Sequence, residues 1–189
     1  MTTVLIVDDE PAITDVYETW LSEYDCFVAH GGSEAMAIFE RRGDEIEVVL
    51  LDRRMPGKSG DEVLSEIRER TAECRVAMIT AVAPDYDIVD MPFDDYVTKP
   101  VSGQKVRSTV ESLLERAEYA DALDRYYTLA TKYAALTAAR PSAELRDSEA
   151  FRELEAELRD VERELTESAT FDDHEEFQNL LLEATREAT

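Results

Sequence analysis

Short runs of apolar residues that end in a charged or hydroxyl-bearing residue recur through the first half of the chain. Val4–Val7 and Val48–Leu51 are two such runs, and each is followed directly by aspartate. Apolar runs without polar alternation are typical of central strands in a parallel sheet, which are covered on both faces. Between the runs, apolar residues recur at helical spacing. Strands that alternate with helices predict an α/β layer fold with a parallel sheet and right-handed crossovers.

The spacing predicts five strands with helices between them. The strands are expected at residues 4–7, 26–29, 48–51, 76–80 and 96–98. Pro11 suits the first position of a helix, because its fixed φ is already helical. The apolar face of that helix consists of Ile13, Val16, Tyr17, Trp20 and Leu21. Two further helices are marked by Ala35, Ile38 and Phe39, and by Val63, Leu64 and Ile67.

The chain changes character after Gly103, because no strand pattern returns and no further glycine occurs. One long helix is expected from about residue 104 to about 140, where Pro141 cannot continue it. A second helix is expected at about 142–168 and a short third one at about 172–187. The domains expected are an α/β domain over residues 1–118 and an all-α tail, a helical hairpin or coiled coil, over residues 119–189.

The two longer helices of the tail carry apolar residues at heptad spacing. In the second helix this seam consists of Phe151, Leu154, Leu158, Val161 and Leu165. In the first helix one seam consists of Tyr119, Ala122, Tyr126, Leu129, Tyr133 and Leu136. Beside it runs a second seam of Ala120, Leu123, Tyr127, Ala130, Ala134 and Thr137. Such a face is wider than one partner helix covers. Either the tail is a local hairpin with some aromatic surface or, as we favour, the hairpin also packs against a second copy and forms a homodimer.

The charge of the chain bears on its partners. The sequence has 44 acidic and 20 basic side chains and a net charge of −24, which argues against broad contacts with the phosphates of nucleic acid. Lysine is scarce, the lysines being Lys58, Lys99, Lys105 and Lys132. This composition resembles that of proteins from salt-accumulating organisms, where dense counterions shorten the screening length to a few ångströms. In that setting the charge serves solubility, which weakens the argument against nucleic acid without reversing it.

The sequence gives no sign of a membrane or secreted protein. None of the apolar runs approaches the roughly 18–20 residues that a membrane span needs, and the N-terminus lacks the pattern of a signal peptide. Cys26 and Cys74 show no C-x-x-C spacing and are expected to be plain buried thiols in a reducing compartment. We therefore expect a cytoplasmic protein.

Polar side chains with complementary chemistry fall at the carboxyl ends of the expected strands. Asp8 and Asp9 follow the first strand, Asp52 follows the third, Thr80 ends the fourth and Lys99 follows the fifth. In a doubly wound sheet these ends converge on one crevice, where the strand order reverses. Crowded carboxylates repel one another unless a cation lies between them, and Mg²⁺ prefers a few carboxylates, waters and a phosphate oxygen. A hydroxyl and an ammonium group would contact the other phosphoryl oxygens, which predicts a phosphoryl-transfer site.

Four segments resemble, in order, the receiver domain of two-component response regulators. They are Val-Asp8-Asp9-Glu-Pro, Leu-Leu-Asp52-Arg-Arg-Met-Pro-Gly, Ile-Thr80-Ala and Tyr96-Val-Thr-Lys99-Pro100, and the resemblance covers about residues 1–118. It implies that Asp52 is the phosphoacceptor and that Thr80 and Lys99 hold the phosphoryl oxygens. It also implies that the protein is a switch that assists its own Mg²⁺-dependent phosphotransfer and dephosphorylation, rather than an enzyme in the ordinary sense.

The same resemblance implies further features of the site and the fold. Asp9 would bind Mg²⁺ directly and Asp8 through water, together with Asp52 and the backbone carbonyl of Arg54. Tyr96 would be the switch aromatic, which swings inward as Thr80 moves toward the phosphate. The fold would be flavodoxin-like, with strand order 2-1-3-4-5 and a cis Lys99–Pro100 peptide bond.

The segment between Thr80 and Lys99 departs from the family pattern. It is shorter than is usual in receivers, it is interrupted by Pro84 and Pro92, and it carries no apolar stripe at helical spacing. The fourth helix is therefore expected to be reduced or missing. In many receivers that helix belongs to the face that dimerises on phosphorylation, so the tyrosine-rich tail becomes the more attractive interface here.

The tail resembles the HalX domain, which follows receivers in haloarchaeal regulators. The resemblance lies in Arg-Ala-Glu-Tyr119-Ala-Asp-Ala-Leu, in Tyr-Ala-Ala-Leu-Thr and in the heptad segment that starts at Phe151. It covers about residues 112–185. Together the two resemblances imply a phosphorelay protein that takes a phosphoryl group from a sensor histidine kinase and relays the signal to a helical output or dimerisation domain.

Two other functions compete with this one. A DNA-binding transcriptional regulator that acts through the tail is the alternative, although the tail is acidic and lacks a helix-turn-helix signature. A phosphatase-type hydrolase that uses Asp52 as nucleophile would need a second acid two residues later, where the chain has Arg54.

Overall fold

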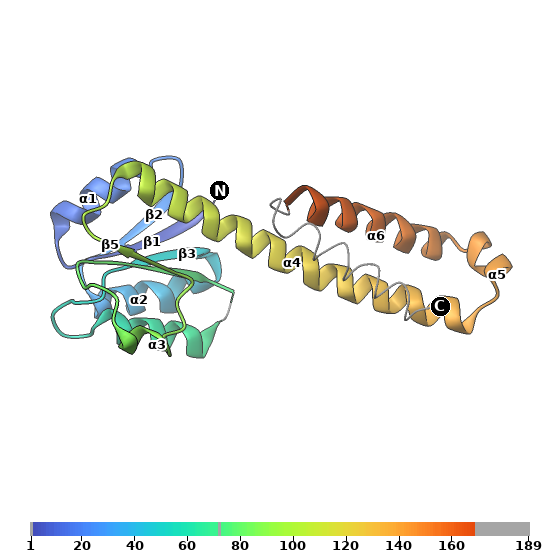
Figure 1. Ribbon diagram of the computed structural model, residues 1–189, viewed down its shortest axis with the longest axis horizontal. Coiled ribbons are helices and arrows are strands. Elements are labelled where there is room, and N and C mark those ends of the chain that lie inside the picture. The colour runs from blue at the N-terminus through green and yellow to red at the C-terminus, as the bar shows by residue number, and fades with distance from the viewer. Residues whose placement is uncertain (1, 72, 169–189) are drawn as a thin grey trace. The chain divides into compact units, whose positions relative to one another are not determined.

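The computed structural model describes residues 2–71 and 73–168, and its N-terminal part is built on a five-stranded parallel sheet (Figure 1). The strands are β1 (Thr3–Val7), β2 (Asp25–Ala29), β3 (Val48–Leu51), β4 (Arg75–Thr80) and β5 (Asp95–Thr98). Their hydrogen-bonded order is β2-β1-β3-β4-β5, and every neighbouring pair is parallel. The predicted fold class and strand order are thereby confirmed. The Lys99–Pro100 peptide bond is cis, as the resemblance implied.

Helices cover both faces of this sheet. They are α1 (Pro11–Trp20), α2 (Gly32–Arg42), α3 (Gly60–Arg70) and the first turns of α4 (Gly103–Ala139), with short 3-10 turns η1 (Gly43–Glu45) and η2 (Tyr86–Ile88). Local sequence explains where they begin. Pro11 occupies the first position of α1. Ser59 caps α3 in a reciprocal pair with Glu62, because its hydroxyl accepts from the Glu62 amide at 3.3 Å while the Glu62 carboxylate accepts from the Ser59 amide at 2.8 Å.

The core consists of two clusters of buried side chains, one on each face of the sheet. Consecutive residues of β1 alternate between them, because successive side chains of a strand point to opposite faces. Leu5 joins the cluster that includes Leu64 of α3, whereas Ile6 joins the cluster that includes Val110 of α4. All of β1 from Val4 to Val7 is at most 1% exposed, as the unbroken apolar run predicts.

The connection between β4 and β5 contains no α-helix and only the 3-10 turn η2. The predicted reduction of the fourth helix is therefore confirmed. A helix would attach this connection to the domain through its apolar face. Here polar contacts attach it instead. Arg68 donates to the Pro92 carbonyl at 2.8 Å and forms an ion pair with Asp94, whose carboxylate also accepts from the Val76 amide at 2.7 Å.

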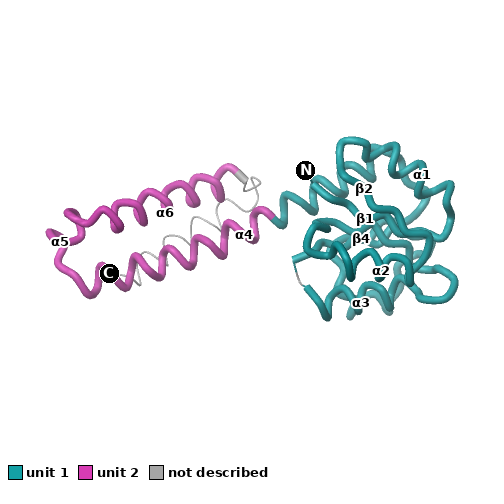
Figure 2. The backbone as a smooth tube through the Cα atoms, turned by 180° about the vertical axis from the view of Figure 1, so that it is seen from behind, with its two compact units in different colours: residues 1–117 teal, residues 118–189 magenta. Residues whose placement is uncertain are grey.

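The chain divides into two compact units, residues 1–117 and 118–189 (Figure 2). The second contains the rest of α4, then α5 (Ser142–Asp147) and α6 (Glu149–Ser168). The single helix expected at about 142–168 is thus interrupted at Ser148, which is extended and whose hydroxyl accepts from the Phe151 amide at 3.3 Å. Serine is a favoured N-cap residue, so α6 begins there. The third expected helix, at about 172–187, lies outside the described residues.

Within the second unit, α4 and α6 pack through the first of the two seams of α4. Ala122, Tyr126 and Leu129 are buried in a cluster with Val161 and Leu165 of α6. Farther along the hairpin, Tyr133 stacks on Phe151 with ring centroids 5.4 Å apart. The second seam is less covered, since its Tyr127 is 51% exposed. Across the part of the chain that the structure describes, no helix has the length and apolar character that crossing a membrane requires.

Candidate functional site

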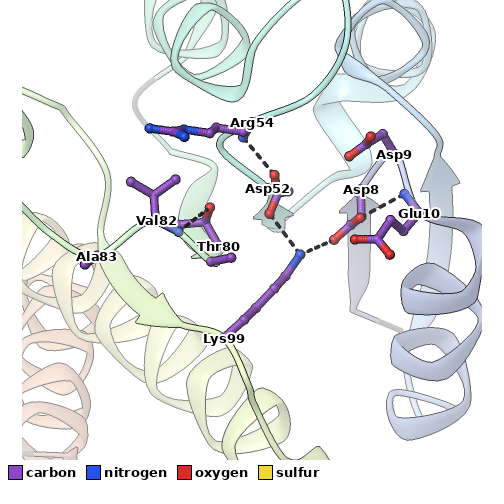
Figure 3. Close-up of a pocket in the computed structure, with 10 residues that line it drawn as sticks. Asp8, Asp9, Glu10, Asp52, Arg54, Thr80, Val82, Ala83 and Lys99 are labelled. Carbon is purple, nitrogen blue, oxygen red and sulfur yellow. Dashed lines mark hydrogen bonds and ion pairs between the residues drawn. The ribbon is translucent and has the colours of Figure 1, made fainter.

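A pocket of about 480 Å³ lies at the carboxyl ends of four strands (Figure 3). The parallel register explains why polar residues gather there, because Val7 lies beside Leu51 and the next residue of each strand is an aspartate. The lining residues are Asp8, Asp9, Glu10, Asp52, Arg54, Thr80, Ala81, Val82, Ala83 and Lys99. The structure therefore brings together every polar side chain that the sequence placed at a strand end.

The Lys99 ammonium lies between two buried carboxylates. Its Nζ donates to Asp8 Oδ2 at 2.5 Å and to Asp52 Oδ1 at 2.9 Å (Figure 3). The Asp8 and Asp52 side chains are only 3% and 8% exposed, so these pairs are screened little by salt. Burial lowers the pKa of Lys99, but the hydrogen bonds and charges of both carboxylates outweigh it, and the pKa is raised. Lys99 is therefore a permanent positive charge beside Asp52.

The Asp52 carboxylate is held by its own loop. Its second oxygen, Oδ2, accepts from the Arg54 amide at 2.7 Å, and the Asp52 amide donates to the Val7 carbonyl at 2.8 Å. The start of α3 packs tightly on the same backbone, since a Cβ on Gly60 would lie 2.1 Å from the Asp52 carbonyl oxygen. Glycine at this position allows the helix to approach the acceptor loop. Asp52 is thus positioned by main-chain contacts from three directions.

The oxygen ligands expected for Mg²⁺ line the pocket without forming a coordination sphere. Asp8 also accepts from the Glu10 amide at 3.0 Å, and Asp9 is partly exposed beside it. Within residues 2–71 and 73–168, no three His, Cys, Asp or Glu side chains are grouped as for a metal ion. The donor set is nevertheless the hard oxygen set that Mg²⁺ prefers, because the carboxylate residues Asp8, Asp9, Glu10 and Asp52 line the pocket.

The two residues expected to switch are connected by Val82. Thr80 is buried, and its hydroxyl accepts from the Val82 amide at 3.3 Å. Tyr96 does not line the pocket. Its hydroxyl donates to the Val82 carbonyl at 2.8 Å, and its ring packs on Phe93 with centroids 5.4 Å apart. A short chain of hydrogen bonds therefore joins the pocket to Tyr96.

Several residues near the site were not assigned from the sequence. Glu10, Val82 and Ala83 line the pocket, and the only signal for them is that they follow the strand-end residues Asp9 and Thr80 in the chain. Arg53, the residue after Asp52, is absent from the lining and binds acidic side chains outside the pocket instead.

Comparison with known proteins supports the same interpretation. Residues 4–111 match the family model of the response regulator receiver domain, and residues 115–181 match that of the HalX domain. The chain is 47% identical over 163 residues to a "Putative transcriptional regulator" of Haloferax volcanii. The aligned region covers 85% of the chain but only 27% of that protein. The chain therefore spans about a quarter of the length of this relative.

Solved structures show the fold of the first unit. The response regulator TrrA of Thermotoga maritima, crystallised with Mg²⁺ and BeF, is 32% identical with a TM-score of 0.55, over 60% of the chain and 99% of TrrA. A crystal structure of the histidine kinase ThkA in complex with TrrA matches with 33% identity and a TM-score of 0.54, again over 60% of the chain and 99% of the matched chain. A receiver domain is a phosphoacceptor switch rather than a classical enzyme. The chain thus belongs to the response regulators and consists of a receiver domain followed by a HalX domain.

Proposed function

We propose that the protein is a phosphorelay switch whose Asp52 accepts a phosphoryl group from the phosphohistidine of a sensor histidine kinase. The observation that carries this proposal is the buried Asp52 carboxylate, held by the Arg54 amide and facing the Lys99 ammonium in an open pocket. The kinase as donor is supported by the complex of ThkA with TrrA, to which the chain is similar. We place the reaction in the cytoplasm.

The residues of the chain have distinct parts in this transfer. A carboxylate oxygen of Asp52 attacks phosphorus, and the new O–P bond forms as the N–P bond to the imidazole breaks and its electron pair returns to nitrogen. Lys99, whose pKa is raised, stays charged and faces the oxygens on which negative charge gathers. The Thr80 hydroxyl ends the neighbouring strand and donates to another of these oxygens.

Mg²⁺ fits the oxygen ligands of the pocket. Asp8, Asp9, Asp52 and the Arg54 carbonyl would hold it, and when bound it supplies positive charge to the phosphoryl oxygens. The proposal is supported by the donor set and by TrrA, which was solved with Mg²⁺ and BeF.

The phosphoryl group would act on a two-state element beside the pocket. It adds a charge of about −1.5 to −2. The Thr80 hydroxyl, which now accepts from the Val82 amide, would move toward the phosphoryl group to donate to it, and Val82 and Tyr96 would rearrange with it. From there we propose that the signal reaches the tail through α4, which contributes residues to both units.

Phosphorylation by a small donor tests this function. The protein is incubated with acetyl phosphate and Mg²⁺, and intact mass is measured with time. One added phosphoryl group is expected for the wild type and for Asp15→Asn, an exposed aspartate of α1 outside the pocket. No stable addition is expected for Asp52→Asn. Equal labelling of Asp52→Asn and the wild type would overturn the assignment of the acceptor.

A DNA-binding regulator that acts through the tail is the second candidate. It is favoured by the printed name of the Haloferax volcanii relative, a putative transcriptional regulator. The net charge of −24 opposes it, because phosphates are bound by basic side chains. Binding of mixed genomic fragments at molar salt discriminates the two, since a tail that only contacts protein retains no DNA.

We also propose that the tail forms a homodimer through the second seam of α4. The support is the width of the apolar face and the exposure of Ala120 and Tyr127 in this seam, whose Leu123 and Ala130 pack on the α4–α6 cluster. Light scattering after size exclusion at high salt, with and without beryllofluoride, measures the mass directly. A monomer in both states would refute the dimer.

A further inference from the structure

Arg53 is a buried arginine next to the proposed phosphoacceptor. Its side chain is only 10% exposed. Asp52 lines the pocket, whereas Arg53 lies among acidic groups outside it. Its backbone also contacts α3, since the Arg53 carbonyl accepts from the Gly60 amide at 2.9 Å and a Cβ on Gly60 would lie 2.9 Å from the Arg53 Cα.

The guanidinium binds two elements that are distant in sequence. Its Nε donates to Asp61 of α3 at 3.0 Å, and one of its terminal nitrogens also reaches Asp61 at 3.1 Å. The same terminal nitrogen forms an ion pair with Asp87 of η2. The hydrogen bonds to Asp61 and Asp87 raise the pKa of Arg53, and the Tyr96 hydroxyl adds a smaller contribution. Arg53 thus stands between the acceptor loop, α3, η2 and Tyr96.

The turn η2, which Arg53 binds through Asp87, has few other contacts with the rest of the domain. Tyr86 is 91% exposed and Val89 is 75% exposed, so η2 buries little apolar surface. The turn is closed by its own amides, with Ile88 donating to the Asp85 carbonyl at 3.1 Å and Val89 to the Tyr86 carbonyl at 3.3 Å. Where receivers have a fourth helix, this chain has a segment that an ion pair connects to Arg53.

We propose that Arg53 is a positioning residue that passes a change at Asp52 to η2 through the Arg53–Asp87 ion pair. The inference rests on the proposed function, because it supposes that the acceptor loop responds to a phosphoryl group. Asp52 and Arg53 share one peptide bond, so a movement of the loop moves the guanidinium. The planar guanidinium binds Asp61 and Asp87 at once, which a lysine ammonium cannot do with the same geometry. Because the Arg53 side chain is buried, salt screens this ion pair less than it screens exposed ion pairs.

Amide hydrogen exchange measures this coupling in the full chain. The probes are the amides of Ile88 and Val89, compared with and without beryllofluoride and Mg²⁺ and corrected for intrinsic rates. Asp87→Asn removes the carboxylate partner at a side chain that is 54% exposed, so the fold is retained. Arg53→Gln removes the other partner without altering the sequence around the probes. The matched control is Asp90→Asn, an exposed aspartate of the same segment with the same charge change.

Without the phosphoryl mimic, exchange at the probes should rise about two- to fivefold in Asp87→Asn and Arg53→Gln, as loss of one partly exposed ion pair predicts. It should not rise in Asp90→Asn, and Asp87→Glu should restore protection. Amides of β1 should keep their wild-type rates in Asp87→Asn, which a general loss of stability would not allow. With the mimic, the wild type and Asp90→Asn should change at the probes, and the two Arg53–Asp87 variants should not.

Three results overturn the inference by different routes. If Asp87→Asn and Asp90→Asn behave alike, or if the variants keep the wild-type response to the mimic, the ion pair carries no coupling. If the wild type responds in residues 52–54 but not at Ile88 and Val89, the coupling fails while the proposed function stands. If the wild type responds nowhere, the proposed function itself fails and the coupling fails with it.

Discussion

Replacing Lys99 by methionine should destabilise the first unit strongly. The change removes the ammonium but keeps most of the apolar stem, and it leaves Asp8 and Asp52, 3% and 8% exposed, without their counter-charge. Removal of one partner from a buried ion pair costs about 3–5 kcal/mol. Because the Lys99 side chain is 16% exposed, we expect a loss at the lower end, about 3 kcal/mol. With a slope of about 2 kcal/mol per molar, the urea midpoint should fall by about 1.5 M.

Trp20 makes this measurement specific to the first unit, because it is the one tryptophan of the chain and packs on Tyr17 at 5.6 Å. Its fluorescence is followed during urea unfolding. The matched control is Lys58→Met, which removes an ion pair with Glu66. The side chains of Lys58 and Glu66 are 28% and 35% exposed. Such a pair contributes about 0–1 kcal/mol. Equal midpoints for the two variants would refute the view that Lys99 neutralises a buried acidic site.

The same lysine predicts a pH dependence and a metal dependence. Since the folded pKa of Lys99 is raised, its stabilisation is complete below the unfolded value of 10.5 and is lost as pH rises through the higher folded pKa. The wild type should therefore lose stability above pH 10.5 more steeply than Lys99→Met. Excess Mg²⁺ should restore part of the loss in Lys99→Met and leave Lys58→Met unchanged. Parallel alkaline curves for the wild type and Lys99→Met would contradict the assignment.

Three further changes test local features. Gly60→Ala should cost about 1–3 kcal/mol in urea unfolding, because a Cβ there meets backbone at 2.1 Å, whereas Gly31→Ala, with nothing within 4 Å, should cost far less. Ser148→Ala should lower tail helicity in circular dichroism and cost about 1 kcal/mol, and an unchanged melting curve would argue against the cap. Burial raises the pKa of Cys74 to about 12, so it should react with a thiol reagent at pH 8 only as fast as the protein unfolds.

The features that could be predicted best from the sequence are those that depend only on residues close together in the chain. An apolar run that ends in aspartate indicates a buried strand and a side chain at its carboxyl end, so Asp52 could be placed before any contact was known. Parallel strands then require these ends to meet, which the Lys99–Asp52 distance of 2.9 Å reflects. The strand order came from the resemblance to receivers, because a run of apolar residues does not specify its neighbour in the sheet.

Features that depend on competition between elements could not be predicted in this way. Val16 belongs to the apolar spacing of α1 but is 41% exposed, because the sheet covers a narrower stripe than the spacing offers. The break at Ser148 was hidden because the residues around it favour helix equally well on both sides. The direction of the Arg53 side chain depends on its ion pairs with Asp61 and Asp87. These two aspartates come close to each other only after the sheet has formed.

The central claim is that Asp52 carries the phosphoryl group, and locating the modification tests it most directly. The protein is phosphorylated with acetyl phosphate and Mg²⁺ and treated with borohydride, which reduces an aspartyl phosphate to homoserine, and the peptides are sequenced by mass spectrometry. We expect homoserine at position 52 and unmodified aspartate at positions 8 and 9. Homoserine at position 8 or 9 with an intact Asp52 would contradict the account.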